Sequence, residues 1–337
     1  MDVSLFDYHL PKERIAQKPK RPREAARLLC LDRRTGAIQH LHVSDFISLI
    51  RPSDVIVFND SKVFKARLLG KKETGGMVEV FLLRPQKGRS WEVLLGGKRT
   101  HEGSRIYFSG GISCVLIKKH EDCWTADFSV LPSRLISMCE RIGQTPTPPY
   151  IKTKAAANTY QTVYANPRKI GSVAAPTAGF HFSKSTLRAL KDKSADIQFV
   201  TLHVGIGTFA PVKEKDITKH VMHAEYAEVD AATLSALRKA KRAGKRIIAV
   251  GTTTVRTLEA AFSTNEREFS GFISSFIYPG YTFTGVDAML TNFHLPKSTL
   301  LMLVSAFAGR KHVLRAYRAA VRKNYRFYSF GDAMFIS

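Results

Sequence analysis

Four segments of the sequence combine histidine, threonine and glycine in patterns suited to binding a small ligand. The first, Gly171–Phe182, reads G-S-V-A-A-P-T-A-G-F-H-F and carries no charged side chain, in a protein of formal charge +24. Its glycines and proline disfavour a helix, and its small residues let backbone groups approach a ligand closely. Pro176, Thr177 and His181 are therefore candidate ligand contacts, with a tight surface loop as the alternative.

The second segment, Thr201–Pro211, places His203 at the end of a predicted strand, before a double-glycine turn. Backbone donors in such a turn could hold a carboxylate or a sugar hydroxyl, which makes Gly205 and Thr208 candidate contacts. Neither a third glycine nor a helix follows the G-x-G spacing. The segment therefore does not indicate a dinucleotide-binding fingerprint.

The third segment, Lys219–Glu225, reads K-H-V-M-H-A-E and leaves three interpretations open. His220, His223 and Glu225 could bind a divalent metal, although their spacing matches no common closed site. On a strand, His223 and Glu225 would share a face, where a carboxylate can set the tautomer of a histidine. That pair could be structural, or it could contact or activate a substrate.

The fourth segment, Val250–Glu259, reads V-G-T-T-T-V-R-T-L-E and leads from a predicted strand into a helix. Helix N-termini bind anions through unpaired N–H groups, and hydroxyls cap them. Capping accounts for one threonine, whereas three threonines and an arginine favour a ligand carboxylate or phosphate. These candidates are Thr252, Thr253, Thr254 and Arg256.

A further stretch, Phe276–Lys297, interleaves aromatic residues with amide and imidazole groups. Aromatic rings stack on nucleobases, and the amide of Asn292 offers a paired donor and acceptor. Core packing is the alternative for the phenylalanines, but Tyr278 precedes a Pro-Gly turn that should be exposed. With His294, these residues complete a neutral pocket inside a basic shell.

The charge of the chain indicates an extended polyanion as partner. The 52 lysines and arginines outnumber the 28 aspartates and glutamates, which is typical of nucleic-acid-binding proteins. The cations concentrate in three blocks, Lys12–Arg34, Arg238–Arg246 and Arg310–Arg326. A solvated helix face is the alternative for each block, but three blocks together favour contacts with a phosphate backbone.

Length and composition predict a globular protein of two domains. The chain has 337 residues, of which 44% are hydrophobic, enough to bury a sizeable core. It contains no apolar run of about 18 residues and no leader pattern at Met1–Tyr8, so we expect a cytoplasmic protein without membrane contact. The four cysteines lack C-x-x-C spacing, which predicts reduced thiols and no metal site.

Residues 65–145 have the pattern of an antiparallel β-barrel, because short apolar strands alternate there with glycine pairs. The strands are expected at Ala66–Leu69, Met77–Leu83, Ser90–Leu95, Arg105–Phe108, Ile112–Ile117 and Trp124–Val130. The proline-rich stretch Gly143–Tyr150 closes the unit as a semi-rigid link.

The rest of the chain alternates strand-like and helical runs, which is typical of an α/β fold. Further strands are expected at Asp54–Phe58, Gln198–Val204, Arg246–Val250 and Phe276–Tyr278. Asp230 and Ser298 are predicted N-caps of helices that end near Gly244 and Gly309. We therefore predict an α/β catalytic domain, residues 1–64 and 146–337, with a barrel-like sheet and helices, into which the all-β barrel of residues 65–145 is inserted.

These segments belong to a longer ordered series of motifs. The series includes F-D-Y-H-L-P-K from Phe6, V-F-N-D-S-K from Val57, Y-Q-T-V-Y-A from Tyr160, I-Y-P-G-Y from Ile277 and L-T-N-F-H-L-P-K from Leu290. Nearly end to end, it resembles the S-adenosylmethionine:tRNA ribosyltransferase-isomerases of queuosine biosynthesis. The resemblance implies an α/β domain with an inserted β-barrel, and it adds Tyr160 and Gln161 as substrate contacts. The chain departs from the family pattern at Ser274, where an aspartate is common.

The resemblance implies a transferase that uses S-adenosylmethionine as a ribosyl donor. The ribosyl unit moves to the aminomethyl group of 7-aminomethyl-7-deazaguanine (preQ1) at the tRNA wobble position. It is rearranged there to give epoxyqueuosine, while adenine and methionine leave. The expected partners are preQ1-containing tRNA and S-adenosylmethionine, which is consumed as a co-substrate. No metal or redox cofactor is implied, and we expect a monomer.

This reaction assigns roles to the candidate residues. The sulfonium acidifies the C5′ hydrogens of the donor, and a neutral histidine in a dry pocket suits the base that removes one. Our hypothesis is that His203 or His181 is this base, while His223, Glu225 and the three threonines orient the donor. Arg256 is a candidate partner for the methionyl carboxylate.

Two other classes of function are alternatives. A non-catalytic RNA-binding protein would account for the charge but not for the pocket. A metal-dependent hydrolase would use His220, His223 and Glu225.

Overall fold

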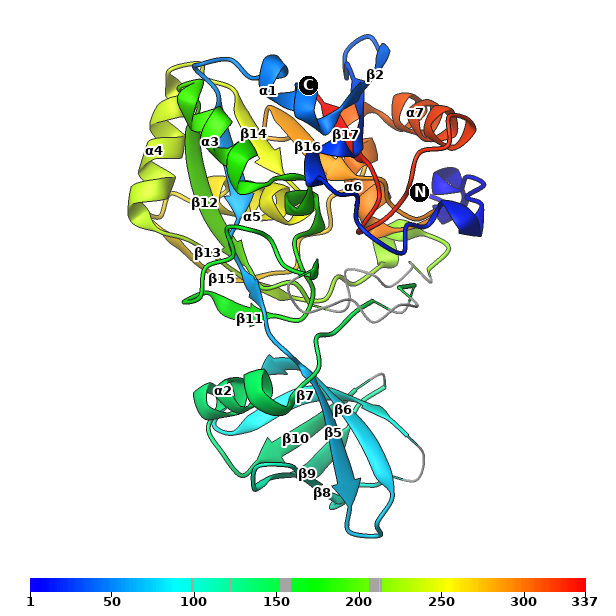
Figure 1. Cartoon of the computed structure of the whole chain (residues 1–337), viewed down its shortest axis with the longest axis vertical. Coiled ribbons are helices and arrows are strands. Elements are labelled where there is room, and N and C mark those ends of the chain that lie inside the picture. The colour runs from blue at the N-terminus through cyan, green and yellow to red at the C-terminus, as the bar shows by residue number, and fades with distance from the viewer. Residues whose placement is uncertain (98–99, 122, 149, 152–158, 206–211, 213) are drawn as a thin grey trace.

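Two domains joined by a narrow neck make up the structure (Figure 1). It is a computed structural model that describes residues 1–97, 100–121, 123–148, 150–151, 159–205, 212 and 214–337. The larger domain contains both ends of the chain, and the smaller one hangs from it as a separate barrel. The predicted class, a mixed α/β fold with an inserted antiparallel barrel, is confirmed.

The smaller domain is a closed six-stranded barrel in the order β10-β7-β6-β5-β8-β9, with antiparallel neighbours. Its strands are β5 (Arg67–Lys72), β6 (Met77–Pro85), β7 (Ser90–Gly96), β8 (Arg105–Phe108), β9 (Ile112–Lys119) and β10 (Trp124–Phe128). All six overlap the predicted strands, because side chains that alternate between core and solvent give a strong sequence signal. Helix α2 (Pro132–Ile142) was not predicted, and it packs Leu135 and Cys139 against the barrel core.

The larger domain is built on an open nine-stranded sheet in the order β15-β13-β12-β3-β14-β16-β17-β1-β2. Its strands are β1 (Arg27–Leu31), β2 (Ile38–His42), β3 (Val55–Asn59), β12 (Asp196–Leu202), β13 (Glu225–Val229), β14 (Ile247–Val250), β15 (Phe269–Ile273), β16 (Ala288–Asn292) and β17 (Ala333–Ile336). Strands β15 and β2 form its two edges, so the sheet is open where a barrel-like sheet was expected. A separate pair joins β4 (Lys62–Val63) to β11 (Ile170–Ser172).

The four central strands, β12, β3, β14 and β16, run parallel to one another. Such strands are covered on both faces and read as continuous apolar runs. Strand β3 shows this directly, since Val55 and Val57 enter one core cluster while Ile56 and Phe58 enter another. Because the four strands are parallel, the residues that follow them meet at one edge of the sheet.

Helices cover the two faces of the sheet (Figure 1). They are α1 (Phe46–Leu49), α3 (Lys184–Asp192), α4 (Ala231–Arg242), α5 (Thr252–Phe262), α6 (Thr299–Ala308) and α7 (Arg310–Arg322). Short 3₁₀ helices span Val3–Phe6, Lys12–Arg14, Arg23–Ala25, Val43–Asp45, Thr177–His181 and Ile217–Lys219. The predicted caps are confirmed: the side chain of Asp230 accepts from Thr233 N, and that of Ser298 accepts from Leu301 N.

The predicted strand at Phe276–Tyr278 is wrong. These residues follow the edge strand β15 and have no assigned strand geometry. Ile277 is buried in the main core, and Phe276 and Tyr278 pack against it. Their apolar pattern therefore reflects packing of a loop rather than strand pairing.

None of the helices in the described part of the chain is long and apolar enough to cross a membrane. All four cysteines are free, and Cys114 and Cys139 are buried in the barrel core.

The neck consists of two chain segments that run side by side. Arg67 and Gln144 form an antiparallel bridge, in which Gln144 N donates to Arg67 O at 2.8 Å. Lys65 Nζ donates to the carbonyl of Glu140, which lies in the last turn of α2, at 2.6 Å. Gly143 lies between the two segments, so close to Lys65 O that a Cβ there would overlap it.

We expect Gly143→Ala to lower the free energy of unfolding by about 1–3 kcal/mol, because the added methyl group forces the two segments apart. Its Cβ would also stand 2.6 Å from Cys139 O. Urea denaturation monitored by tryptophan fluorescence measures the loss. Gly271→Ala is the control, since no atom lies within 4 Å of a Cβ at that position. Equal stability of the two variants would contradict the steric role of Gly143.

Candidate active site

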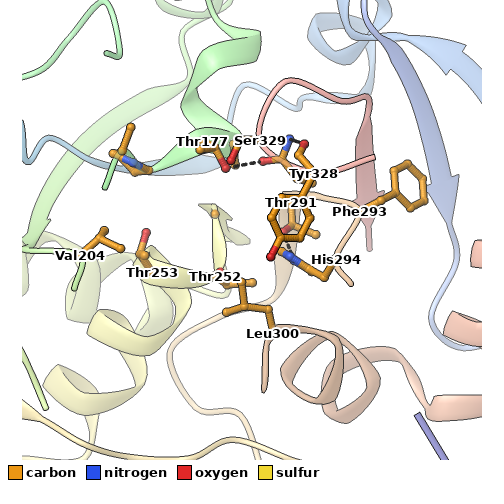
Figure 2. A pocket seen from close by; sticks show the side chains of 15 residues that line it. Thr177, Val204, Thr252, Thr253, Thr291, Phe293, His294, Leu300, Tyr328 and Ser329 are labelled. Carbon is orange, nitrogen blue, oxygen red and sulfur yellow. Dashed lines mark hydrogen bonds between the residues drawn. The ribbon is translucent and has the colours of Figure 1, made fainter. Parts of the chain in front are cut away.

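A small hollow lies at the edge of the sheet where the central parallel strands end (Figure 2). It has a volume of about 40 Å³, room for a functional group or a water rather than a whole ligand. Its lining residues are Ala175, Pro176, Thr177, Ala178, Val204, Gly251, Thr252, Thr253, Thr291, Asn292, Phe293, His294, Leu300, Tyr328 and Ser329. The structure thus brings together residues predicted from three separate segments.

Asn292, the last residue of β16, is the hydrogen-bonding centre of this hollow. Its Oδ1 accepts from Thr177 Oγ1 at 3.0 Å, and its Nδ2 donates to the carbonyl of Tyr328 at 3.2 Å. The same amide nitrogen lies 3.1 Å from His181 Nε2, which therefore accepts. Asn292 thus joins the 3₁₀ helix Thr177–His181 to the C-terminal segment.

His181 is buried behind this amide and does not line the hollow. Burial lowers its pKa to about 4, and the neighbouring guanidinium groups of Arg23 and Arg326 act in the same direction. The ring is therefore neutral at pH 7, with one nitrogen engaged by Asn292. This arrangement suits a positioning role rather than proton removal.

His294 forms a fixed part of the wall. Its Nε2 lies 3.0 Å from Thr291 Oγ1, and its backbone is held by two tyrosine hydroxyls, those of Tyr8 and Tyr317. Burial lowers its pKa to about 3. His294 therefore contributes a neutral, immobile surface to the hollow.

The three threonines at the start of α5 divide into two roles. Thr252 and Thr253 line the hollow, and Thr253 Oγ1 accepts from Asn59 Nδ2 at 3.3 Å. Thr254 is fully buried and donates to Val250 O at 2.7 Å. Thr254 therefore does not line the hollow, and its contact with a ligand stays a prediction.

A larger cleft, of about 410 Å³, separates the main domain from the barrel. Its volume falls in the range of small-molecule sites. The barrel and α2 contribute Leu83, Arg84, Pro85, Trp91, Glu92 and Ile136, and the main domain contributes Ile170, Gly171, His203, Val204, Gly205, His223, Ala224, Glu225, Tyr226 and Phe272. Val204 borders both spaces, so the cleft and the small hollow adjoin.

His203 occupies a confined position in this cleft, directly after β12. Its ring stacks on Tyr226, with centroids 5.9 Å apart and planes inclined by 16°. On Gly171, a Cβ would stand 3.0 Å from three atoms of the same ring. The absence of a side chain at position 171 thus makes room for the imidazole.

The imidazole of His203 also has an unsatisfied polar atom. Its Nδ1 is buried, and within the described part of the chain it has no hydrogen-bond partner. Burial lowers the pKa of His203, an effect partly offset by the nearby carboxylates of Glu228 and Asp60. A buried nitrogen of this kind indicates a partner beyond the described residues, such as a ligand or a water. The same holds for the indole nitrogen of Trp91 across the cleft.

Glu225 and Arg256 form a buried ion pair at the inner wall of the cleft. Only 4% of the Glu225 side chain and 3% of the Arg256 side chain is exposed. Glu225 Oε1 also accepts from Gly205 N at 2.8 Å. Arg256 is thus engaged by Glu225 in this structure, and its contact with a methionyl carboxylate stays a prediction. Sequence could not anticipate this ion pair, because the two residues lie 31 positions apart.

The metal interpretation of the third segment is not favoured. Across the described residues, no three histidine, cysteine, aspartate or glutamate side chains are grouped to hold an ion. Glu225 is engaged by Arg256 and Gly205, and His220 packs edge-on against Phe276. His223 lines the cleft from the segment just before β13, two residues ahead of Glu225.

Three predicted substrate contacts lie outside both spaces and have structural roles. Tyr160 is fully buried between Phe180 and Phe330, with ring centroids 5.6 and 6.1 Å away. Gln161 exchanges hydrogen bonds with the backbone of Val63 next to the neck. Tyr278 packs beside Phe276 at 5.1 Å. Their contacts with the substrate stay predictions, because family motifs do not separate packing residues from contacts.

Thr208, another predicted contact, lies outside the described residues. Ser274 is exposed, one residue beyond the end of β15.

Two parts of the site, one from the C-terminal segment and one from the barrel, were not predicted from the sequence. Tyr328 and Ser329 line the small hollow, and Trp91 and Glu92 of β7 line the cleft. The motif Y-S-F-G-D-A-M from Tyr328 was a usable signal for the first pair. Trp91 gave none, because its place in the cleft depends on how the domains are arranged.

We expect Glu225→Gln to lower the free energy of unfolding by about 3–5 kcal/mol, because it leaves the Arg256 cation buried without its counter-ion. The matched control is Glu228→Gln on the same strand, whose ion pair with Lys169 is partly exposed and is worth about 0–1 kcal/mol. Chemical denaturation of both variants measures the difference. Similar small losses would show that the buried pair is not a main stabilising contact.

Comparisons with known proteins agree with this architecture. The family model described as "Queuosine biosynthesis protein" matches residues 3–336. The chain is also similar to the crystal structure of S-adenosylmethionine tRNA ribosyltransferase from Thermotoga maritima. The two share 36% sequence identity with a TM-score of 0.59, over 99% of this chain and 100% of that chain. The chain therefore belongs to the queuosine biosynthesis protein family.

Proposed function

We propose that this protein is an S-adenosylmethionine:tRNA ribosyltransferase-isomerase that acts on preQ1 at the tRNA wobble position. It transfers and rearranges the ribosyl unit of S-adenosylmethionine to give epoxyqueuosine, with release of adenine and methionine. Membership of the queuosine biosynthesis family and the likeness to the Thermotoga maritima enzyme support this assignment. The protein works in the cytoplasm as a monomer, without a metal or redox cofactor.

The observation that carries the proposal is the environment of His203. The ring lines a cleft large enough for a nucleoside, and the same cleft is lined by Trp91, whose indole N–H has no partner among the described residues. Its lowered pKa keeps it neutral at pH 7 and able to accept a proton. Neither His181 nor His294 combines these properties, since each has a ring nitrogen bonded to a neighbouring side chain.

In the proposed mechanism His203 is the general base. The positive sulfur of the donor acidifies its C5′ hydrogens, and the imidazole takes one of them to become imidazolium. The amine of preQ1 forms the new C–N bond to the ribosyl unit and loses a proton. The bond to adenine breaks and the imidazolium gives its proton to the departing adenine. The C–S bond breaks with its electrons going to sulfur, so that methionine leaves as a neutral thioether. The dry wall formed by Gly171 and Tyr226 keeps water away from the proton-transfer step.

The small hollow holds a polar end of the donor in this proposal. Backbone N–H groups at the start of α5 are suited to a carboxylate, and the hydroxyls of Thr252 and Thr253 line the same space. This site is a candidate for the methionyl carboxylate beside Arg256. Asn292 and Thr177 supply further hydrogen bonds at the opposite wall.

Incubation of the protein with S-adenosylmethionine and preQ1-containing tRNA is expected to release adenine and methionine in equal amounts. Liquid chromatography quantifies both products. A tRNA with guanine at the wobble position is the control, because guanine lacks the aminomethyl group that accepts the ribosyl unit. Binding of tRNA without adenine release would instead favour the RNA-binding alternative, and loss of activity with a chelator would favour the metal-dependent one.

We expect His203→Gln to reduce kcat by about 10²–10⁴-fold, the usual contribution of a general base. In the wild-type protein kcat should fall with decreasing pH only below the ordinary histidine pKa of 6.5, because the base must be neutral and its pKa is lowered. Steady-state adenine release across pH measures both effects. Undiminished turnover of His203→Gln, with His181→Gln inactive, would transfer the role to His181.

A further inference from the structure

Helix α7 carries a stripe of cations along its outer face. Its members are Lys311, Arg315, Arg318 and Arg322, all exposed. Their spacing of four, three and four residues places them on one side of the helix. The opposite side is buried in the main core through Val313, Leu314 and Tyr317. The helix Arg310–Arg322 contains no carboxylate.

Within the described part of the chain, no ion pair involves any of these four cations. Like charges at this spacing destabilise a helix by about 0.2–0.5 kcal/mol per pair. The uncompensated stripe therefore indicates an anion supplied by another molecule.

The fold adds two parts of the N-terminal basic block to this stripe. Arg315 donates to Gly36 O, and His312 Nδ1 lies 3.4 Å from Arg33 O, which places the exposed Arg33 and Arg34 beside α7. After the helix, Arg326 donates to Lys18 O. Figure 1 shows the N-terminal segments next to α7. Two blocks about 300 residues apart thus form one surface, whose exposed cations are Lys18, Lys20, Arg21, Arg33, Arg34, Lys311, Arg315, Arg318, Arg322 and Lys323.

The basic block at the end of α4 differs, because half of its charge is used inside the protein. Lys241 pairs with Asp287 at 2.6 Å, and Arg246 pairs with Asp54 at 2.6 Å. Arg238 donates to three carbonyl oxygens, that of Ala261 in the last turn of α5 and those of Thr264 and Glu266 after it. Two blocks of similar sequence therefore have different surfaces.

Two chain segments connect the α7 surface to the active site. The chain that leaves α7 reaches Tyr328 and Ser329, which line the small hollow. Lys20, Arg21 and Arg23 line a neighbouring depression of about 340 Å³. Arg23 donates to the carbonyl of Phe180, next to His181. A bound polyanion on α7 could therefore extend toward the reacting groups.

We propose that the outer face of α7, together with the exposed cations of Lys18–Arg34, binds the phosphate backbone of the tRNA substrate. This inference rests on the proposed function for the identity of the RNA. The block on α4 contributes little to that contact. Because phosphate contacts do not depend on the base sequence, the surface should bind an unmodified transcript as well as the substrate.

The test compares two triple variants that each remove three exposed positive charges. The first is Lys311→Gln, Arg318→Gln and Arg322→Gln on α7, and the control is Lys239→Gln, Arg242→Gln and Lys245→Gln on α4. Arg315 is left intact because it braces Gly36. Fluorescence anisotropy with an unmodified tRNA transcript gives Kd over a series of salt concentrations.

We expect the α7 triple variant to raise Kd by about tenfold or more and to reduce the slope of log K against log salt by about 3. The control should change Kd by less than about threefold. Equal weakening in both variants would mean that only net charge matters, and would overturn the proposal, as would an unchanged Kd for the α7 variant. Thermal unfolding monitored by circular dichroism checks that both variants fold.

Two further measurements distinguish a wrong RNA-binding surface from a wrong proposed function. Calorimetric binding of S-adenosylmethionine should be the same for both triple variants. If the wild-type protein binds the transcript but releases no adenine with preQ1-containing tRNA, the assigned reaction is wrong. The contrast between α7 and α4 would still decide where RNA binds.

Discussion

Parallel pairing of the four central strands is the constraint on which the site depends. Because β12, β3, β14 and β16 run in one direction, their C-terminal ends meet at one edge of the sheet. His203, Asn59, Thr252 and Asn292 each stand at or just after such an end. Ligand sites of open α/β sheets form at these edges for the same geometric reason. The remaining structure serves to close this edge, through the 3₁₀ helix at Thr177–His181, the C-terminal segment and the barrel.

The parts of the structure that sequence could predict are those governed by local rules. Barrel strands follow from alternation of apolar residues, and the caps at Asp230 and Ser298 follow from short polar side chains before apolar helices. The candidate residues that line the two spaces were recognised because small and neutral residues are unusual in a chain this basic. Helix α2 was not predicted although its signals are present, since Pro132 stands at its first turn and Leu135 and Cys139 share one face.

The limits of prediction arise where a partner is distant in sequence. Arg256 has the features of an anion ligand until β13 supplies Glu225, and Tyr160 resembles a contact residue until Phe180 and Phe330 enclose it. The cleft itself is a product of domain arrangement, so Trp91 could not be anticipated. Charge shows the same limit: two basic blocks alike in composition differ once Asp54 and Asp287 pair with two of the cations in one of them.

Gly171 contributes to the site because it has no side chain. His203 occupies the volume that any other residue at this position would need for its Cβ. In an alanine scan, substitution normally deletes a side chain and reports what that side chain did. At position 171 the same substitution adds a methyl group, and its effect would report on the displacement of His203 instead. In a mutational map of this surface, a loss of activity on substitution of Gly171 would therefore report the effect of an added group, not of a removed one.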